Sequence, residues 1–175
     1  LLDAIRAVGD GNPGATNVLL AGGKAWGLLA LLLDVFKGAL PVSLAKYAFG
    51  VSGWALLPVS LAPIFGHAFS PWLKGRGGKA VAVSFGVWIA LTLWEAPTLG
   101  GLLLGLWFAL ISVSGWAVLL SLICLIAYYL LTNPDPVLLV VLAVNLALLA
   151  YKYRADLSQF PLPREWVTRR LWRPS

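Results

Sequence analysis

Six apolar runs, separated by polar turns, dominate this chain. A helix needs about 20 apolar residues, rising about 1.5 Å per residue, to cross a bilayer. Several runs approach or exceed that length. Only 11% of the 175 residues are charged, whereas an average soluble domain has about 25%. So few charges could hardly cover a soluble surface, and the pattern predicts an all-α protein, a polytopic transmembrane helix bundle forming a single domain.

The predicted spans end at polar turns or at turns rich in glycine and proline. Glu95-Ala96-Pro97 is predicted to end the third span, because proline breaks a helical pattern. The stretch 98–131 is too long for one helix, so a break near Ser114 is predicted. The expected spans are residues 25–49, 54–66, 80–94, 98–112, 115–131 and 137–152.

Charge predicts which ends of these spans face the cytoplasm. Two spans separate residues 1–24 from the loop 66–80, and four more separate that loop from the basic, interfacial tail 153–175. All three polar segments are therefore expected on one side, which the positive-inside bias makes cytoplasmic. This bias also accounts for the net charge of +6 without a nucleic-acid partner. The segments and their borders hold 11 of the 13 Lys and Arg residues: Arg6, Lys24, Lys74, Arg76, Lys79, Lys152, Arg154, Arg164, Arg169, Arg170 and Arg173.

The loop 66–80 carries the strongest local signal for chemistry. Glycines such as Gly77 and Gly78 lack side chains, so the backbone there could wrap around an anion, and Arg76 and Lys79 supply positive charge. A helix is expected to begin near Lys79, and the N–H groups of a helix N-terminus favour anions. The open alternative is a flexible basic loop that contacts lipid head groups.

The segment GNPGATN, residues 11–17, also presents polar groups near the membrane surface. Asn12, Thr16 and Asn17 can form hydrogen bonds with phosphate or hydroxyl oxygens. The alternative is a loop that leads into a helix, with Thr16 or Asn17 as the N-cap.

Three more polar residues have both a structural and a functional interpretation. His67 is the single histidine of the chain and lies at a predicted membrane–water boundary. Asp34 and Lys37 lie three apart on one face of a predicted span, where charges are costly and often functional. They could instead form an ion pair that packs helices. A transporter path through them is disfavoured, because the polar groups gather at one face rather than at the midplane.

Polar motifs with a specific order and spacing extend over nearly the whole chain: Val8-Gly9-Asp10-Gly11-Asn12-Pro13-Gly14-Ala15-Thr16-Asn17, Leu33-Asp34-Val35-Phe36-Lys37-Gly38, Gly66-His67-Ala68-Phe69 and Gly75-Arg76-Gly77-Gly78-Lys79-Ala80-Val81-Ala82. Together they resemble the bacterial acyl-phosphate-dependent glycerol-3-phosphate acyltransferases, PlsY. That family has seven transmembrane helices and a cytoplasmic active site. On this comparison, the chain is expected to lack the first helix.

The resemblance implies an enzyme of phospholipid biosynthesis in the bacterial inner membrane. It implies transfer of a fatty acyl group from acyl phosphate to the 1-hydroxyl of glycerol 3-phosphate, which gives lysophosphatidic acid. No acyl-CoA, metal or other cofactor is implied, and the oligomeric state is left open. The predicted catalytic residues are His67, Lys79 and Asn12. The predicted substrate-binding residues are Arg6, Gly11, Gly14, Thr16, Asn17, Arg76, Gly77, Gly78, Arg154 and Asp156.

Four positions depart from the usual pattern of that family. Asp10 stands where the family usually has Ser, and Leu20 where it usually has a basic residue. Tyr153 and Asp156 replace a His and an Asn. The carboxylates of Asp10 and Asp156 are expected to repel a nearby phosphate. These departures leave an alternative: a diverged homologue with another acceptor, or one that binds phospholipid or phosphate without catalysis.

Overall fold

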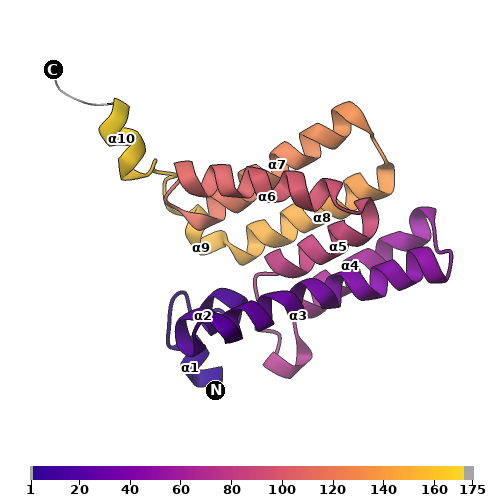
Figure 1. Ribbon diagram of the computed structural model, residues 1–175, viewed down its shortest axis with the longest axis horizontal. Helices are drawn as coiled ribbons and strands as arrows, with labels where there is room; N and C mark the ends of the chain where they lie inside the picture. Colours follow the sequence, from indigo (N-terminus) through magenta and orange to yellow (C-terminus); the bar gives the residue numbers. More distant parts are fainter. Residues whose placement is uncertain (1, 172–175) are drawn as a thin grey trace. The chain divides into compact units, whose positions relative to one another are not determined.

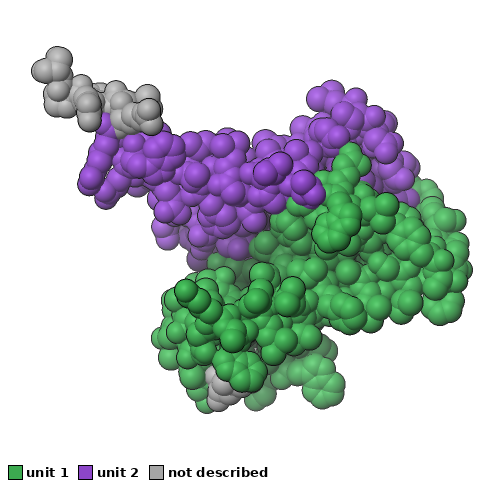
Figure 2. All heavy atoms as spheres, in the orientation of Figure 1, with its two compact units in different colours: residues 1–97 green, residues 98–175 purple. Residues whose placement is uncertain are grey.

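The computed structural model describes residues 2–171, in which every regular element is helical apart from one isolated bridge between Ile111 and Pro163. The predicted all-α class is therefore confirmed. The chain divides into two compact units, residues 1–97 and 98–175 (Figure 2). The single domain expected from the sequence stays a prediction. Arg173 and the end of the predicted basic tail lie outside the described residues.

Helical segments account for all six predicted spans. Three are long and apolar enough to cross a membrane, and three shorter apolar helices complete the set. Many leucines of the first span point outward, including Leu28, Leu32 and Leu33, each 56% exposed. An apolar outer surface of this kind suits lipid and not water. The long segments are Lys24–Ala48, Gly53–Leu73 and Ser114–Thr132, and the shorter ones are Val81–Thr92, Glu95–Leu110 and Pro136–Lys152.

The first unit contains five α-helices and three short helical turns (Figure 1). A π-helical turn, η1, extends α3, and two 3-10 turns, η2 and η3, flank α4, so the second span is longer than predicted. The α-helices are α1 (Leu2–Arg6), α2 (Ala15–Gly22), α3 (Lys24–Ser43), α4 (Leu56–Ala68) and α5 (Val81–Thr92). The turns are η1 (Leu44–Ala48), η2 (Gly53–Ala55) and η3 (Pro71–Leu73).

Two glycines allow α3 and α5 to pack with their backbones in contact (Figure 1). A Cβ atom on Gly38 would overlap the carbonyl oxygen of Val83, and one on Gly86 would overlap that of Val35. Small residues give membrane helices this close approach, since lipid offers no hydrophobic drive for helix association. The contact sets the position of α5 and therefore of the loop that precedes it.

The side chains of η1 close the other end of α5. The Lys46 ammonium donates to the carbonyl oxygen of Leu91, and the Tyr47 hydroxyl donates to that of Ala90 at 3.1 Å. The last carbonyls of a helix have no partner within the helix, and an unsatisfied polar group in lipid is costly. These two bonds therefore stabilise the C-terminal end of α5 and help to fix its position against η1.

The junction between α5 and α6 (Glu95–Leu110) differs from the sequence prediction. Glu95 and Pro97, predicted to end a span, instead form the first turn of α6. Proline is tolerated there because the first N–H groups of a helix have no intrahelical acceptor, and an acidic residue suits the helix dipole. The Thr92 hydroxyl oxygen accepts a hydrogen bond from the Ala96 amide at 3.0 Å. Leu93, with φ of 57°, makes the turn between the helices.

The second unit contains most of α6 followed by α7 (Ser114–Thr132), α8 (Pro136–Lys152), α9 (Arg154–Leu157) and α10 (Glu165–Leu171) (Figure 1). Two side chains at the start of α10 close the end of α6. Arg164 Nε donates to the Phe108 carbonyl at 2.6 Å, and Trp166 Nε1 donates to that of Ala109 at 2.7 Å. A basic side chain at this end also suits the helix dipole.

Candidate functional site

A tight turn between α1 and α2 presents Asp10. The flanking residues Gly9 and Gly11 have φ of 56° and 70°, in the left-handed region that favours glycine. A Cβ atom on Gly9 would also overlap the side-chain oxygen of Asn17. The turn therefore needs glycine on both sides of Asp10, and it fixes the direction of the carboxylate.

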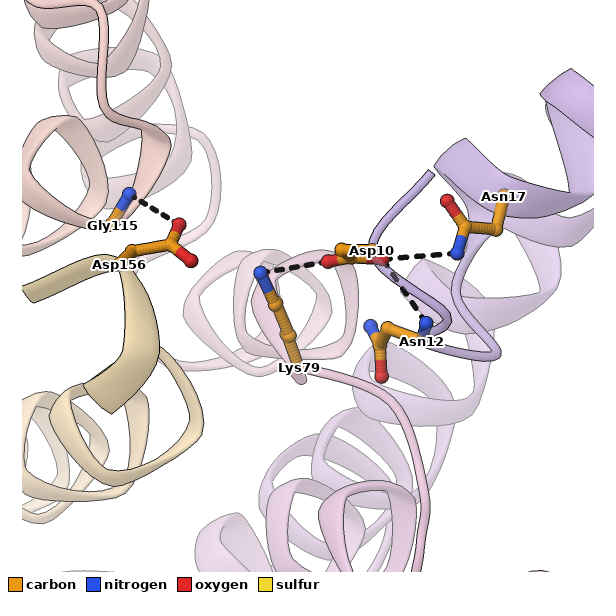
Figure 3. Close-up of polar contacts among 6 residues, drawn as sticks. All are labelled: Asp10, Asn12, Asn17, Lys79, Gly115 and Asp156. Carbon is orange, nitrogen blue, oxygen red and sulfur yellow. Dashed lines mark hydrogen bonds and ion pairs between the residues drawn. The ribbon is translucent and has the colours of Figure 1, made fainter. Parts of the chain in front are cut away.

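The Asp10 carboxylate joins the two polar loops of the first unit (Figure 3). One oxygen, Oδ1, accepts hydrogen bonds from the Asn12 amide at 3.1 Å and from Asn17 Nδ2 at 2.9 Å. The other, Oδ2, lies 2.8 Å from the Lys79 ammonium. The predicted meeting of segments 1–24 and 66–80 at one end of the spans is confirmed by this ion pair.

The charge of Asp10 is stabilised by its partners. Partial burial alone would raise the pKa of Asp10. The hydrogen bond from Lys79, the Asn12 amide, the Lys79 charge and the Asn17 amide together outweigh burial and hold the pKa below its ordinary value. Asp10 is therefore ionised at neutral pH, and it balances the positive charge of Lys79.

His67 at the end of α4 positions the glycine loop. Its side chain is only 8% exposed. A Cβ atom on Gly77 would overlap the His67 carbonyl oxygen, and one on Gly78 would overlap ring atom Nε2. Close packing against His67 therefore requires these two glycines, in addition to any role they have in wrapping an anion. The packing holds the backbone from which Lys79 projects.

Asp34 connects His67 to α3. His67 Nδ1 lies 3.6 Å from Asp34 Oδ1, and the same carboxylate pairs with Lys37 one helical turn away. The ion pair that the sequence left as one of two alternatives is thus present. His67 lies between the α3 carboxylate and the glycine loop, which suits a residue that positions the loop.

The start of α2 corrects a detail of one alternative that the sequence left open. Gly14, with extended angles of −109° and 170°, is the N-cap, whereas that alternative placed Thr16 or Asn17 there. Both lie in the first turn of the helix, so their backbones are already helical. Asn17 is 3% exposed, and its amide is committed to Asp10. A glycine cap costs little here because it still allows the extended backbone that a cap requires.

The other predicted residues of the first unit lie nearer to solvent. Arg6 at the end of α1, Thr16 in α2 and Arg76 in the glycine loop are exposed. Asn12 is half-buried, beside Gly14. These four remain candidates for substrate contact, and the cluster of Asp10, Asn17 and Lys79 forms the organised centre of the site.

Two predicted residues lie in the second unit, on α9, with partners there. Asp156 Oδ2 accepts a hydrogen bond at 3.0 Å from the Gly115 amide at the start of α7 (Figure 3). A carboxylate at a helix N-terminus satisfies a donor and suits the dipole. Arg154 lies over the Tyr151 ring, 4.6 Å from its centroid, and donates to the Tyr151 carbonyl at 3.0 Å.

Sequence reasoning missed the pairing of Asp10 with Lys79 and the packing of His67 on the glycines. For the first, the sequence carries a signal only for the local part of the cluster. An aspartate in a turn often accepts from the backbone amide two residues later, and the Asn12 amide does donate to Asp10, but this bond does not indicate Lys79 as a partner. For the second, no local signal exists, because the contact depends on how α4 and the loop fold together.

Comparison with known proteins agrees with this architecture. A family model for glycerol-3-phosphate acyltransferase matches residues 2–160. Glycerol-3-phosphate acyltransferase 1 of Thermotoga maritima is 45% identical over 95 residues, covering 53% of this chain and 47% of that protein. The Aquifex aeolicus glycerol-3-phosphate acyltransferase is 32% identical over 165 residues, covering 92% and 83%. In matches such as the first, the chain spans about half the length of its relative.

A solved structure shares the fold over most of the chain. It is the crystal structure of PlsY, an integral membrane glycerol 3-phosphate acyltransferase, in its glycerol 3-phosphate form. It aligns with a TM-score of 0.79 at 30% sequence identity and covers 89% of this chain and 77% of PlsY. The family model, the relatives and the fold agree, and the chain belongs to the glycerol-3-phosphate acyltransferase family.

Proposed function

We propose that this protein transfers a fatty acyl group from acyl phosphate to glycerol 3-phosphate. The glycerol hydroxyl oxygen forms an ester bond with the acyl carbon, and the bond from that carbon to the phosphate oxygen breaks. The products are lysophosphatidic acid and inorganic phosphate, and the hydroxyl proton leaves with the phosphate. Family membership supports this proposal, as do the PlsY structures of similar fold in glycerol 3-phosphate and lysophosphatidic acid forms.

The placement of the Lys79 side chain is the observation that carries the proposal. This side chain is only 18% exposed, and it projects from a loop held by His67 toward the polar turn of Asp10 and Asn17. A fixed ammonium in a partly dry site binds phosphate oxygens and stabilises developing negative charge better than one in water. The amides of Asn12 and Asn17 add donors for phosphate or glycerol oxygens.

The proposed chemistry relies on placement more than on a strong acid or base. Aligning a hydroxyl with an acyl carbon supplies much of a rate enhancement by itself. The acyl chain would lie among the apolar helices, whose exposed leucines suit a lipid surrounding. His67 acts by holding the glycine loop, so it is a positioning residue in this scheme.

Product formation tests the proposal directly. Purified protein receives palmitoyl phosphate and labelled glycerol 3-phosphate, and labelled lysophosphatidic acid is measured. We expect product from the parent and a rate lower by about 100-fold in Lys79→Gln, the loss typical of removing one charge-stabilising donor. Lys24→Gln removes an exposed lysine charge at the start of α3 and should keep the parent rate.

Two outcomes would contradict this assignment. If glycerol 3-phosphate binds and no product forms, the chain is a homologue that binds without catalysing. If Lys79→Gln is as active as Lys24→Gln, Lys79 is not the phosphate-binding cation.

We also propose that the protein lies in the bacterial inner membrane with the loop of Lys79 in the cytoplasm. The clustering of 11 of the 13 basic residues on one predicted side supports this orientation. Cys124 is the single cysteine of the chain, and Asn133 lies in the turn between α7 and α8. In a Cys124→Ala background, Asn133→Cys should react with an impermeant maleimide in intact spheroplasts. Lys74→Cys should react only after permeabilisation. The reverse pattern would invert the topology.

A further inference from the structure

We propose that Asp10 is an internal anion that occupies the phosphate position beside Lys79 and sets the affinity of the site for phosphate-bearing ligands. A phosphate must displace the Asp10 carboxylate before it can take the same donors. This inference rests on the phosphate-binding role of Lys79 in the proposed function. In this proposal Asp10 controls the affinity for the ligand and takes part in no chemical step.

The donors around Asp10 are those that a phosphate would use. An ammonium from Lys79, a side-chain amide from Asn17 and the backbone amide of Asn12 converge on one carboxylate at 2.8, 2.9 and 3.1 Å (Figure 3). Charge-assisted bonds from such mixed donors are the usual means of holding an oxyanion. Two oxygens of a phosphate could replace the two carboxylate oxygens in the same positions.

Burial shows which member of the cluster can move. The donors are held, since Asn17 is 3% exposed and the Lys79 side chain is 18% exposed. The acceptor faces solvent, since the Asp10 side chain is 47% exposed. Ion pairs with an exposed partner contribute little to stability, so Asp10 can leave Lys79 at small cost. The donors are therefore preorganised to bind an anion. The anion that they bind in this structure, the Asp10 carboxylate, can be exchanged for another.

The charge of Asp10 decides whether its removal strengthens or weakens phosphate binding. With Asp10 ionised, the Asp10–Lys79 pair is neutral, and an incoming phosphate meets both a neutralised cation and a nearby like charge. Removing the charge of Asp10 while keeping its shape should therefore strengthen phosphate binding. If Asp10 instead served to aim Lys79, the same change would weaken binding, so the two roles predict opposite signs.

The test compares phosphate binding by full-length purified proteins in detergent. Inorganic phosphate and glycerol 3-phosphate are titrated by calorimetry into the parent and into Asp10→Asn, which keeps an oxygen for Asn17. We expect Asp10→Asn to bind both ligands about tenfold more tightly, since a phosphate no longer has to displace a charged carboxylate from Lys79. Asp3→Asn, an exposed acid on α1, removes the same charge outside the cluster and should change affinity little.

A second variant shows whether the gain acts through Lys79. In a Lys79→Gln background, adding Asp10→Asn should give at most a small gain, because the shared cation is gone. A full tenfold gain in that background, or weaker binding in Asp10→Asn with a retained melting temperature, overturns the proposal. So does an equal gain in Asp3→Asn.

The results also separate this inference from the proposed function. If the parent makes no lysophosphatidic acid but Asp10→Asn binds phosphate more tightly, the enzymatic proposal fails and the role of Asp10 stands. If product forms and affinity is unchanged in Asp10→Asn, the role of Asp10 fails alone.

Discussion

Asp10 in the first unit and Asp156 in the second are the two carboxylates expected from the sequence to repel a phosphate, and the structure uses them differently. Asp10 faces solvent and binds the Lys79 ammonium, the backbone amide of Asn12 and the side-chain amide of Asn17. Asp156 binds the backbone amide of Gly115 at the start of a membrane helix. The nature of the partner decides the consequence. A carboxylate that can leave an ammonium affects ligand binding, and a carboxylate that caps a helix end affects stability.

Glycine packing supports each carboxylate contact. The loop of Lys79, which pairs with Asp10, is held because Gly77 and Gly78 pack against His67. Asp156 reaches α7 because Gly115 has no side chain. Substitutions at these glycines and carboxylates can therefore separate effects on activity from effects on stability, and the expected effects are ordered below from the largest.

Gly77→Ala should have the largest effect, which is a loss of activity. Its Cβ would overlap the His67 carbonyl oxygen, so the loop and Lys79 must move. A displacement of about 1 Å can reduce a rate by about 100-fold, and we expect a loss of that size in lysophosphatidic acid formation. Gly105→Ala, where nothing lies within 4 Å, is the matched control and should keep its activity. Equal activity in both variants would show that the loop does not depend on this packing.

Gly115→Ala should act on stability. The new Cβ would lie 2.6 Å from the Cβ of Asp156 and 3.2 Å from that of Tyr153, so α9 must shift. Overpacking of this kind costs about 1–3 kcal/mol, which exceeds the gain of up to about 1 kcal/mol from alanine in a helix. Thermal unfolding in detergent should show a lower melting temperature, with the KM for glycerol 3-phosphate unchanged in the surviving folded protein. A changed KM with normal stability would move Asp156 into the substrate site.

Asp156→Ala should have a smaller effect of the same kind. Loss of the bond to the Gly115 amide removes a helix cap, which lowers the free energy of unfolding by about 1 kcal/mol. Asp156→Asn keeps an oxygen acceptor and should lose less. Denaturation of the three proteins side by side measures both values, and equal stability of parent and Asp156→Ala would show that the cap contributes nothing.

Acidification should reveal the smallest effect, which is the loss of the contribution of Asp10 to the stability of the fold. Because the folded-state pKa of Asp10 lies below its ordinary value of 3.8, its contribution to stability is present above that value. It is lost as the pH falls through the folded-state pKa. With Asp10 half-exposed, we expect less than about 1 kcal/mol. The difference in melting temperature between parent and Asp10→Asn should be constant from pH 6 to 8 and shrink below pH 4. A difference that grows on acidification would contradict this sign.

The spans and the polar ends of this protein were predictable because the bilayer acts on local sequence. Each apolar run of sufficient length must be helical, and each polar turn must reach water. The junction at Glu95 was mispredicted because a helix start and a helix stop both tolerate proline. The side chain that resolves the ambiguity, Thr92, bonds to Ala96 only once the turn has formed.

The sequence by itself determined the helices, the family and the residues Asn12, Asn17, His67 and Lys79 as candidates, since hydropathy and motif spacing are local properties. Only the tertiary structure decided what these residues contact. The expectation that Asp10 repels phosphate stays a prediction, and the structure adds that this carboxylate is held by the donors proposed for phosphate. The contact brings together loops from distant parts of the chain, and those loops meet because helices such as α3 and α5 pack through Gly38 and Gly86.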